Sequence, residues 1–268
     1  MSERHTGRGS ASDQQERRLM IAERVVTRGT VTVDELASAA GVSAMTIYRD
    51  VAALEEAGIV QRGRGTVSAM ATGLHEASAS FRLDQNVALK QALGHAVAQR
   101  INPGMALMLD DSTSGVWTLR ALDVTPLTVI TNSLLVAREV GHSSGVRLIV
   151  AGGTYQPWAE SLMGSATVAQ LGELRADVAI LSASGIADGR CFHPHEDASQ
   201  IKRQMMASAR RRFLILDHTK FARRALYSFA ALTEFDTVFT DDGVDENMRR
   251  ALTETGVPLE VVSAAKAS

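Results

Sequence analysis

The chain has 268 residues, of which 45% are hydrophobic and 22% are charged, with a formal net charge of -2 and one cysteine. The apolar fraction is ample for a buried core and the length allows one large or two smaller domains, which excludes a wholly disordered chain. The single thiol, Cys191, excludes an intramolecular disulfide framework and a cysteine-rich zinc site, and it fits a reducing compartment.

The sequence carries no signal for export or membrane insertion. Met1 to Asp13 is polar and small, without the apolar core of about 7 to 15 residues that secretory signals need. No run approaches the roughly 18 apolar residues that cross a bilayer. We therefore expect a cytoplasmic protein without a membrane partner. Neither the first 75 residues nor the remainder is basic overall, so only motif spacing can indicate nucleic-acid binding.

The first predicted helix shows a single apolar face. Leu19, Ala22, Val25 and Val26 fall on that face at helical spacing. The helix is expected to end just before Gly29, because glycine suits a left-handed C-cap.

Two further helices follow, with a tight turn between them. Thr32 to Glu35 has the spacing of a capping box, which predicts a short helix over Val33 to Ala40. Gly41 suits a left-handed turn and Ser43 an N-cap, which opens a helix over Ala44 to Ala57. This arrangement projects the first residues of the last helix outward, where they can enter a major groove.

A hairpin is predicted after the third helix, with Gly63-Arg64-Gly65 at its tip. Arginines there can follow a phosphate backbone or enter a minor groove. On the third helix, Ile47, Val51 and Leu54 are spaced to face the core. The same spacing also fits a small helical packing module with solvated arginines. The flanking segments of the hairpin are Ile59 to Arg62 and Thr66 to Ser68. The candidate DNA contacts are Ser43, Ala44, Met45, Thr46, Tyr48, Arg49, Arg62 and Arg64.

A family resemblance favours the DNA-binding interpretation. From Val31 to Val60 the chain reads V-T-V-D-E-L-A-S-A-A-G-V-S-A-M-T-I-Y-R-D-V-A-A-L-E-E-A-G-I-V, which resembles the winged helix-turn-helix of the DeoR family of bacterial transcription regulators. That family usually carries two successive arginines where this chain has Tyr48-Arg49, so only Arg49 carries over. Tyr48 can donate to a phosphate or pack on a thymine methyl. A tyrosine here also resembles regulators of the WYL class, although the rest of the chain supports the DeoR resemblance.

The composition changes near residue 70. Ala69 to Ser80 is small and polar and predicts a linker. We divide the chain into a DNA-binding domain over residues 14–68, a linker over 69–80 and a second domain over 81–268. The second domain is predicted to open with a long helix from Phe81 to Ile101.

Beyond this helix, short apolar runs alternate with helical patterns. Continuous apolar runs are typical of strands buried on both faces, and the intervening helices imply right-handed crossovers. The predicted fold is a doubly wound, Rossmann-like α/β sandwich with a mostly parallel sheet. The predicted strands are Ala106 to Leu109, Leu127 to Ile130, Val146 to Val150, Val178 to Leu181, Phe213 to Leu216, Thr237 to Phe239 and Leu259 to Val262. The predicted helices between them include Val116 to Leu122, Leu134 to Val140 and Ile201 to Ala209.

Polar and glycine-rich loops follow several of these strands. Ligands of open α/β sheets collect beyond the carboxyl ends of the strands, and small hydroxyl residues at a helix N-terminus offer donors to a phosphate. Each loop by itself is equally a simple turn. The segments L-D-D-S-T-S, T-V-I-T-N-S, A-G-G-T, A-D-V-A-I-L-S-A-S-G-I, I-K-R-Q-M and L-D-H-T-K-F together resemble, in order, the effector domain of the DeoR family.

This second resemblance implies a fold similar to ribose-5-phosphate isomerase and a sugar phosphate as effector. The family's first loop more often reads D-S-G-T-T, and Asp111 to Gly115 here lacks the internal glycine. The candidate effector contacts that it implies are Asp111, Ser112, Thr113, Ser114, Asn132, Gly152, Gly153, Lys202 and Lys220.

The alternative function is a sugar-phosphate isomerase with an appended helical module. Such isomerases carry an acidic D-G-A-D-E stretch, whereas the matching segment here, Ala176 to Ile180, lacks the carboxylate pair that a proton transfer would use. Cys191 to His195 contains three potential metal ligands, but we interpret it as a loop of neutral side chains. We therefore assign no catalytic residue, metal or cofactor. The expected protein is a repressor that binds double-stranded operator DNA as a homodimer or homotetramer.

Overall fold

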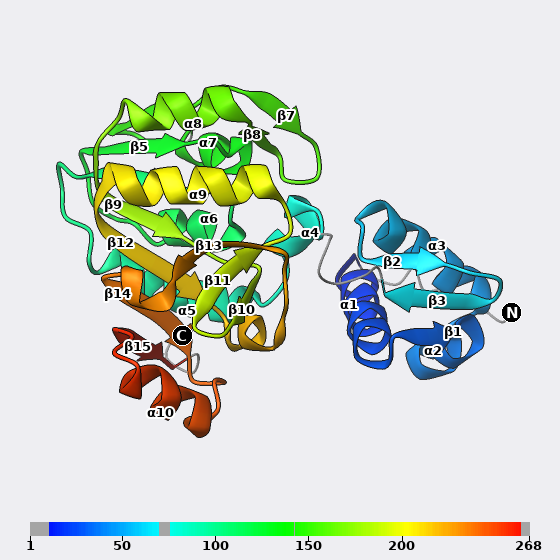
Figure 1. Ribbon diagram of the computed structural model, residues 1–268. Helices are drawn as coiled ribbons and strands as arrows, with labels where there is room; N and C mark the ends of the chain where they lie inside the picture. The colour runs from blue at the N-terminus through cyan, green and yellow to red at the C-terminus, as the bar shows by residue number, and fades with distance from the viewer. Residues whose placement is uncertain (1–10, 70–75, 142, 264–268) are drawn as a thin grey trace, which may run out of the picture. The chain divides into compact units, whose positions relative to one another are not determined.

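The computed structural model describes residues 11–69, 76–141 and 143–263. The chain divides into two compact units, one before and one after the segment near residue 75, and each is described by itself (Figure 1). Residues 70–75 of the predicted linker lie outside the described residues. At the two ends of that linker, Ala69 lies in a strand and Ser78 caps a helix. Within the described residues, no helix is long and apolar enough to cross a membrane.

The first unit consists of three helices and a small antiparallel sheet. The capping box is present, because the Thr32 hydroxyl accepts from the Glu35 amide at 3.2 Å and the Glu35 carboxylate accepts from the Thr32 amide at 2.9 Å. Gly41 has a φ of 63°, as a left-handed turn requires. The elements are α1 (Ala11–Arg28), β1 (Thr30–Thr32), α2 (Val33–Ala40), α3 (Ala44–Glu56), β2 (Val60–Arg62) and β3 (Thr66–Ala69).

The predicted hairpin forms from β2 and β3, and a third strand joins it. The order is β1-β3-β2, and both pairings are antiparallel. The sequence did not predict β1, because three residues between a helix C-cap and a capping box are too few to show an alternating pattern. The helices pack on the sheet through Ile21, Val25, Ile47, Val51 and Leu54, which are at most 1% exposed. This unit is a winged helix-turn-helix.

The second unit is built around a seven-stranded sheet with helices on both faces (Figure 1). Its helices are α4 (Ala79–Leu83), α5 (Val87–Ala98), α6 (Thr113–Arg120), α7 (Leu134–Val140), α8 (Ser165–Gly172), α9 (Glu196–Ser208) and α10 (Glu246–Glu254), with short 3-10 helices η1 (His218–Ala222) and η2 (Leu232–Glu234). The strands of the large sheet are β4 (Ala106–Leu109), β5 (Leu127–Thr131), β6 (Val146–Val150), β9 (Ala176–Leu181), β12 (Ala209–Leu216), β14 (Thr237–Asp241) and β15 (Leu259–Val262).

The large sheet confirms the predicted doubly wound topology. Its order is β15-β14-β12-β9-β4-β5-β6, every pairing is parallel, and each of the seven predicted strands lies in it. The chain runs outward from β4 to β6 and then returns to place β9 on the other side of β4. In such sheets the crevice beyond the strands on either side of this reversal is the usual ligand site.

Two apolar clusters cover the two faces of the sheet. Helices α5, α6 and α7 contribute to one cluster, which includes Leu93, Val116 and Val136. Helices α8, α9 and α10 contribute to the other, which includes Leu171 and Met205. The sheet is therefore buried on both faces, and this explains why its strands are continuous apolar runs in the sequence.

Two expectations about the second unit were wrong in detail. The long helix predicted from Phe81 to Ile101 is two helices, because Asn86 between them has a left-handed φ of 51°. Two small antiparallel sheets were not predicted, and one of their strands, Arg190–His193, includes Cys191 to His193 of the segment interpreted as a loop. Their strands are β7 (Thr154–Gln156), β8 (Ser161–Met163), β10 (Gly185–Ala187), β11 (Arg190–His193) and β13 (Tyr227–Ala231). Segments of three to five residues are too short to show a strand period.

Candidate DNA-binding and effector sites

The exposed side of α3 carries the predicted recognition residues. Met45 is 63% and Tyr48 40% exposed, and Arg49 beside them is also exposed. Neither of these two large side chains, which lie near the start of the helix, belongs to the buried core of this unit. Together with Arg49 they form a surface that can contact base edges and phosphates.

The other predicted residues of this helix serve its first turn. The Ser43 hydroxyl accepts from the Thr46 amide at 3.3 Å, and the two hydroxyl oxygens lie 3.0 Å apart. Ala44 is half-buried. Ser43 therefore fixes where the helix begins, and its contact with DNA stays a prediction.

The two arginines of the wing have different surroundings. The Arg62 amide donates to the Glu55 carboxylate at 2.9 Å, and the Arg62 guanidinium forms an ion pair with the same carboxylate. These two hydrogen bonds lower the pKa of Glu55. Arg64 lies exposed at the tip of the hairpin. Arg64 is therefore the better placed of the two for a phosphate, whereas Arg62 is already bound to α3.

A buried carboxylate that sequence reasoning missed holds α3 to α1. Asp50 is fully buried and accepts from Arg17 at 2.6 Å, from Arg18 at 3.1 Å and from Gln14 at 3.4 Å. A signal was present, because Asp50 shares the helical face of Ile47 and Leu54, where a charge needs a partner. Asp50 thus orients the helix that presents Arg49.

Asp50→Ala should lower the free energy of unfolding of this unit by about 2 kcal/mol, because it removes the acceptor of charged donors that remain partly buried. In native-state hydrogen exchange on the full chain, the amides of α1 and α3 should then exchange about 30-fold faster. Glu56→Ala, an exposed acid on the same helix, is the control and should leave these rates unchanged. Equal rates in both variants would contradict the assigned role of Asp50.

In the second unit, most of the predicted effector residues lie at one edge of the large sheet. Asp111 to Ser114 follow β4, Asn132 follows β5, and Lys220 lies in the 3-10 helix after β12. Because all seven strands are parallel, their carboxyl ends share this edge. The edge includes the crevice beside β4 and β9 where the chain reverses.

Asp110, which was not predicted, joins the loops at the reversal. It is fully buried and accepts from the Ser112 amide at 2.9 Å and from the Ser182 amide at 3.0 Å. It also forms an ion pair with Lys202 of α9. One carboxylate therefore fixes the loops after β4 and β9 and the helix α9 relative to one another.

Lys202 is the buried counter-ion of this loop. It is 2% exposed, and its ammonium contacts Asp110 and lies 3.5 Å from a carboxylate oxygen of Asp111. Burial by itself favours the neutral amine, but the two carboxylates outweigh it and raise the pKa of Lys202. The charge of Lys202 is thus balanced within the protein, and its direct contact with a ligand stays a prediction.

The N-terminus of α6 presents the predicted hydroxyl residues. Ser112 is the N-cap and accepts from the Gly115 amide at 3.2 Å. Thr113 is 4% exposed, and its hydroxyl donates to the Arg82 carbonyl at 3.5 Å. The positive end of the helix dipole and the hydroxyl groups therefore meet at one place.

Asn132 brings an unsatisfied acceptor to the same edge. Its side-chain nitrogen donates to the Leu162 carbonyl at 3.0 Å, whereas its buried Oδ1 has no hydrogen-bond partner among the described residues. The buried Ser161 hydroxyl likewise has none there. Buried polar groups without partners are costly, so a ligand hydroxyl or water at Asn132 would be favourable.

Gly152 and Gly153 have a packing explanation. The Gly152 amide donates to Gln170 at 2.9 Å, and its carbonyl accepts from the Thr167 hydroxyl at 2.8 Å. A Cβ at Gly153 would lie 2.1 Å from the same hydroxyl oxygen. Gly153 therefore lets the loop after β6 approach α8 closely, Gly152 is held to α8 by its backbone hydrogen bonds, and the contact of both with the effector stays a prediction.

A cluster of cations lies next to Thr113, and its central member was not predicted. Lys90 of α5 is 5% exposed and donates to the Arg82 carbonyl. Burial, followed by the positive charges of Lys220 and Arg82, lowers its pKa to about 7, against smaller effects of Asp217 and Asp84. Close approach of α5 to α6 places it there, since a Cβ at Gly94 would lie 2.7 Å from the Trp117 carbonyl. The sequence signal for Lys90 is that it stands three residues before Leu93, on the same buried face of the helix.

The strand end after β12 completes this cluster. Asp217 accepts from the Thr219 amide at 3.1 Å, and Lys220 lies one residue further on. Burial opposes ionisation of Asp217, but Lys220 and the Thr219 hydroxyl outweigh it and lower the pKa of Asp217. Lys90 and Thr113 therefore share the Arg82 carbonyl, and the charges of Lys220, Arg82 and Asp217 act on Lys90.

An aromatic group packs beside the small sheets. Trp158 stacks on His195 with ring centroids 4.2 Å apart, and His193 lies 6.2 Å from Trp158. Among the described residues, no group of three or more His, Cys, Asp or Glu side chains is arranged to hold a metal ion. Cys191 is buried, and its pKa is raised by that burial.

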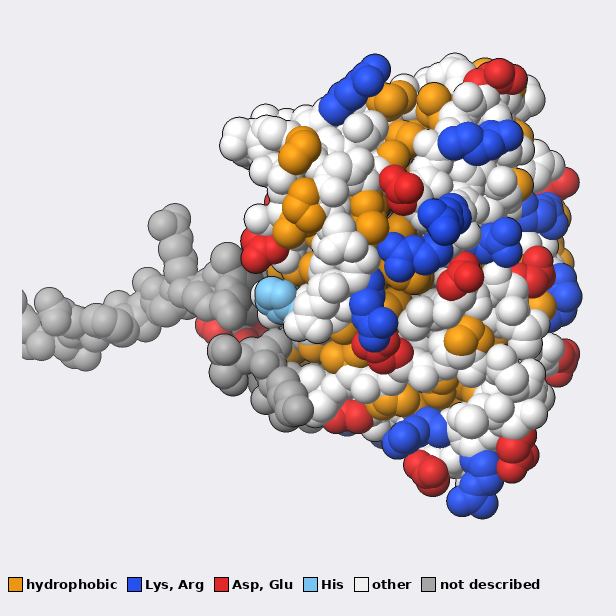
Figure 2. Space-filling model, turned by 90° about the vertical axis from the view of Figure 1, so that its left-hand side faces the viewer, with side chains coloured by type: hydrophobic (Ala, Val, Ile, Leu, Met, Phe, Trp, Pro, Cys, Tyr) orange, Lys and Arg blue, Asp and Glu red, His pale blue; other side chains and the backbone are white. Residues whose placement is uncertain are grey.

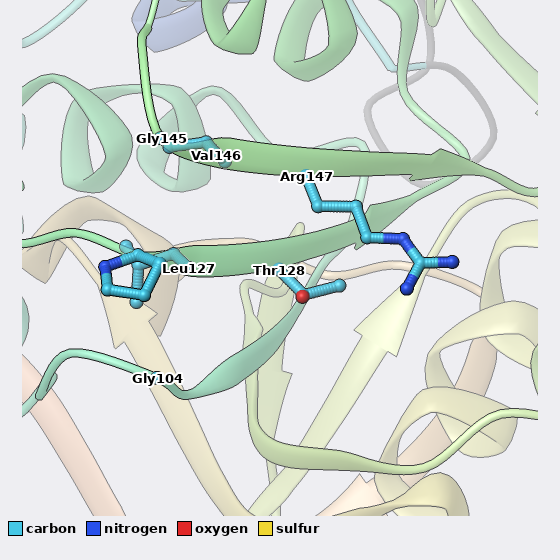
Figure 3. A pocket seen from close by; sticks show the side chains of 7 residues that line it. Gly104, Leu127, Thr128, Gly145, Val146 and Arg147 are labelled. Carbon is cyan, nitrogen blue, oxygen red and sulfur yellow. The ribbon is translucent and has the colours of Figure 1, made fainter.

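The opposite edge of the sheet, where the strands begin, holds an open pocket (Figure 3) and several cationic side chains (Figure 2). Arg100 pairs with Glu260 at 2.6 Å, Arg211 donates to the Arg100 carbonyl at 3.5 Å, and Arg175 donates to the Leu174 carbonyl at 2.8 Å. The fold itself uses these arginines, so we assign no ligand to this edge. The pocket is lined by Gly104, Pro126, Leu127, Thr128, Gly145, Val146 and Arg147.

Family models match both units. Residues 17–72 match the DeoR-like helix-turn-helix domain, and residues 85–242 match the DeoR C terminal sensor domain. The chain belongs to the DeoR family. The resemblance inferred from the sequence motifs is thus confirmed, and the protein is a DNA-binding transcription regulator with a sensor domain.

Relatives match almost the whole chain. The HTH-type transcriptional regulator YgbI of Escherichia coli K12 is 33% identical over 92% of this chain and 97% of that protein. The transcriptional repressor GlcR of Bacillus subtilis is 28% identical over 92% and 96%, and the glycerol-3-phosphate regulon repressor of Escherichia coli K12 is 29% identical over 90% and 96%. Both units of the DeoR fold are therefore shared with these proteins.

Solved structures with a partly similar chain path include an isomerase. Ribose 5-phosphate isomerase A from Methanocaldococcus jannaschii is 14% identical over 51% of this chain and 55% of that chain, with a TM-score of 0.38. The α/β architecture of the sensor domain rests on its own sheet order and pairings.

Proposed function

We propose that this member of the DeoR family represses genes of carbohydrate metabolism and that a phosphorylated sugar controls its binding to operator DNA. The observation that carries the effector class is that two buried donors, Lys90 and Thr113, converge on the Arg82 carbonyl at the carboxyl edge of the sheet, where the charges of Lys220 and Arg82 also act on Lys90. The names of relatives, among them a glycerol-3-phosphate regulon repressor, support carbohydrate genes as targets.

Two parts of the site suit two parts of such a ligand. Cations and the N-terminus of α6 favour a phosphoryl group, because each compensates negative charge. Asn132, with its unsatisfied Oδ1, and Asp111 suit sugar hydroxyls. We infer that the phosphoryl group binds near Lys90 and Thr113 and that the sugar extends toward Asn132.

We infer that the protein acts as a homodimer or homotetramer in the cytoplasm. Two recognition helices read two half-sites when the protein has two-fold symmetry, and operator DNA and sugar phosphates are both available in that compartment. Size-exclusion chromatography with light scattering tests this assembly, and a monomer bound to operator DNA would contradict it.

The structure favours a regulator over the isomerase alternative. Asp177 is the carboxylate in the segment that matches the isomerase acidic stretch, and it accepts from the Ala106 amide at 2.8 Å. Both residues lie at the start of their strands, at the edge of the sheet opposite Thr113. Asp177 is thus too far from the candidate effector site to act as its base.

The deciding experiment is fluorescence anisotropy of the full chain on DNA from upstream of its own gene, over a salt series, with a panel of sugar phosphates. Salt-sensitive binding that exceeds binding to random DNA, and that one sugar phosphate weakens, is expected. Binding that shows no sequence preference at any salt, combined with turnover of a pentose or hexose phosphate, would replace the proposal with the isomerase.

Arg49→Ala should weaken operator binding by about 5- to 150-fold, the range for losing one base or phosphate contact of an arginine. Effector affinity, measured by calorimetry, should stay unchanged because Arg49 lies in the other unit. Lys220→Ala is the matched reciprocal variant, with operator affinity retained and the sugar-phosphate response reduced. Operator affinity equal to that of the unaltered protein would remove Arg49 from the recognition surface.

A further inference from the structure

The short helix α4 is held by groups that belong to the candidate effector site. The carbonyl of Arg82, in its last turn, accepts from the Lys90 ammonium and from the Thr113 hydroxyl at 3.5 Å, as well as from the Gln85 amide at 3.2 Å. Lys90 and Thr113 are the two buried donors to which we assign the phosphoryl group. Anchoring of α4 and recognition of an anion therefore draw on the same donors.

The other attachments of α4 involve both tryptophans of the chain. The Trp117 indole donates to the Leu83 carbonyl at 3.2 Å, and the Ala79 amide donates to the Trp158 carbonyl at 2.7 Å. The Leu83 side chain packs against the apolar cluster that contains Leu93. With only five residues, α4 has little internal stability and depends on these attachments.

Thr113 and Lys90 cannot donate equally well to the Arg82 carbonyl and to a phosphoryl oxygen at the same time. Thr113 has a single hydroxyl hydrogen, so donation to a phosphoryl oxygen ends its donation to the Arg82 carbonyl. Lys90 has three N–H groups, but its ammonium would be drawn toward the stronger, charged acceptor. The Arg82 carbonyl would then keep the bond from the Gln85 amide but lose two donors, in a partly buried environment that penalises lost hydrogen bonds.

We propose that a phosphoryl ligand competes with the Arg82 carbonyl for Thr113 and Lys90, so that effector binding releases α4 from the sensor domain. This inference rests on the proposed function and adds its regulation. In the chain, α4 is the first helix after the DNA-binding unit, so its release adds residues 79–83 to the stretch of chain that connects the two units. Two recognition helices on a longer tether hold half-site spacing less tightly, which weakens operator binding.

Because the ligand and α4 compete for the same donors, a weaker attachment of α4 must strengthen ligand binding. An α4 with a purely structural role would not have this effect on ligand affinity. A variant that weakens the attachment of α4 elsewhere should bind the effector more tightly, because less attachment has to be given up. Leu83→Ala should therefore increase affinity for the active sugar phosphate by about 2- to 10-fold. Leu148→Ala, which trims a partly buried leucine of the same cluster on β6, is the control and should leave affinity unchanged.

The release itself is measured by hydrogen exchange on the full chain, with ribose 5-phosphate, glucose 6-phosphate, fructose 6-phosphate, glycerol 3-phosphate and inorganic phosphate as probes. Binding by calorimetry together with faster exchange of the amides of residues 79–83 is expected. In the Trp158→Phe variant, emission of Trp117 should also shift to longer wavelength as its indole loses the Leu83 carbonyl.

The outcomes separate this inference from the proposed function. Calorimetric binding with unchanged or slower exchange at residues 79–83, or weaker binding by Leu83→Ala, overturns the release of α4 and leaves a sugar-phosphate sensor. If none of the probes binds at millimolar concentration, the proposed effector class fails, and the inference fails with it.

Discussion

Asp110→Ala is expected to lower the free energy of unfolding of the sensor domain by about 3 to 5 kcal/mol, as breaking a buried ion pair typically does. The variant leaves the Lys202 ammonium, which is 2% exposed, with Asp111 at 3.5 Å as its remaining carboxylate. It also removes the acceptor of the Ser112 and Ser182 amides. Three segments that meet at the reversal of the sheet would lose their common partner.

Urea unfolding followed by tryptophan emission measures this effect, because Trp117 and Trp158 both lie in the sensor domain. Asp123→Ala, an exposed acid, is the matched control and should change the free energy of unfolding by less than about 0.5 kcal/mol. In the double variant Asp110→Leu with Lys202→Met, part of the stability should return, since the buried Lys202 ammonium is no longer left behind, whereas the Ser112 and Ser182 amides still lack their acceptor and Asp111 loses its contact with Lys202. A loss below about 1 kcal/mol for Asp110→Ala would show that water reaches Lys202.

The sequence was a good guide wherever a local pattern matched the environment of an element. The strands β4, β5 and β9 are buried on both faces, so they appear as uninterrupted apolar runs. The capping box at Thr32 and the N-cap at Ser43 are satisfied within three or four residues. Such features depend on neighbours in the chain, and they need no knowledge of the fold.

The sequence was a poor guide wherever a residue depends on a partner far along the chain. Asp110 and Lys202 are 92 residues apart, and neither carries a local mark of its ion pair. Lys90 was overlooked because a lysine on a helix is usually solvated. The break at Asn86 and the three-residue strands of β7 and β10 were missed because tertiary contacts stabilise them.

Affinity for the sugar phosphate should fall as pH rises above 7, by about tenfold per pH unit, if one proton is taken up with the ligand. In the free protein the pKa of Lys90 is lowered to about 7 by burial and by Lys220 and Arg82, so above pH 7 most of its amine is neutral. Only the ammonium attracts a phosphoryl group, and the bound anion raises the pKa again. The phosphate itself is already fully ionised there, since its second pKa is about 6.

Calorimetry between pH 7 and 9 in buffers of different ionisation enthalpy measures both the slope and the proton uptake. Lys90→Arg is the control, because a guanidinium stays charged throughout this range and should flatten the slope. A slope of similar size in that variant would assign the titration to another group, of which Lys220 has the largest charge effect on Lys90.

The same lowered pKa of Lys90 predicts that the free energy of unfolding rises with pH, whereas the affinity for the sugar phosphate falls. Between pH 7 and about 10.4, the unfolded chain holds a proton that the folded protein has lost, so the free energy of unfolding rises with pH across that window. Below pH 7 the folded protein carries the full cost of a buried ammonium.

Lys90→Met should therefore raise the unfolding midpoint at pH 6 while abolishing sugar-phosphate binding. If the unfolding midpoint instead falls, the ammonium stabilises the fold through the Arg82 carbonyl. The hydrogen bond from Lys90 to the Arg82 carbonyl would then outweigh the cost of burying the ammonium.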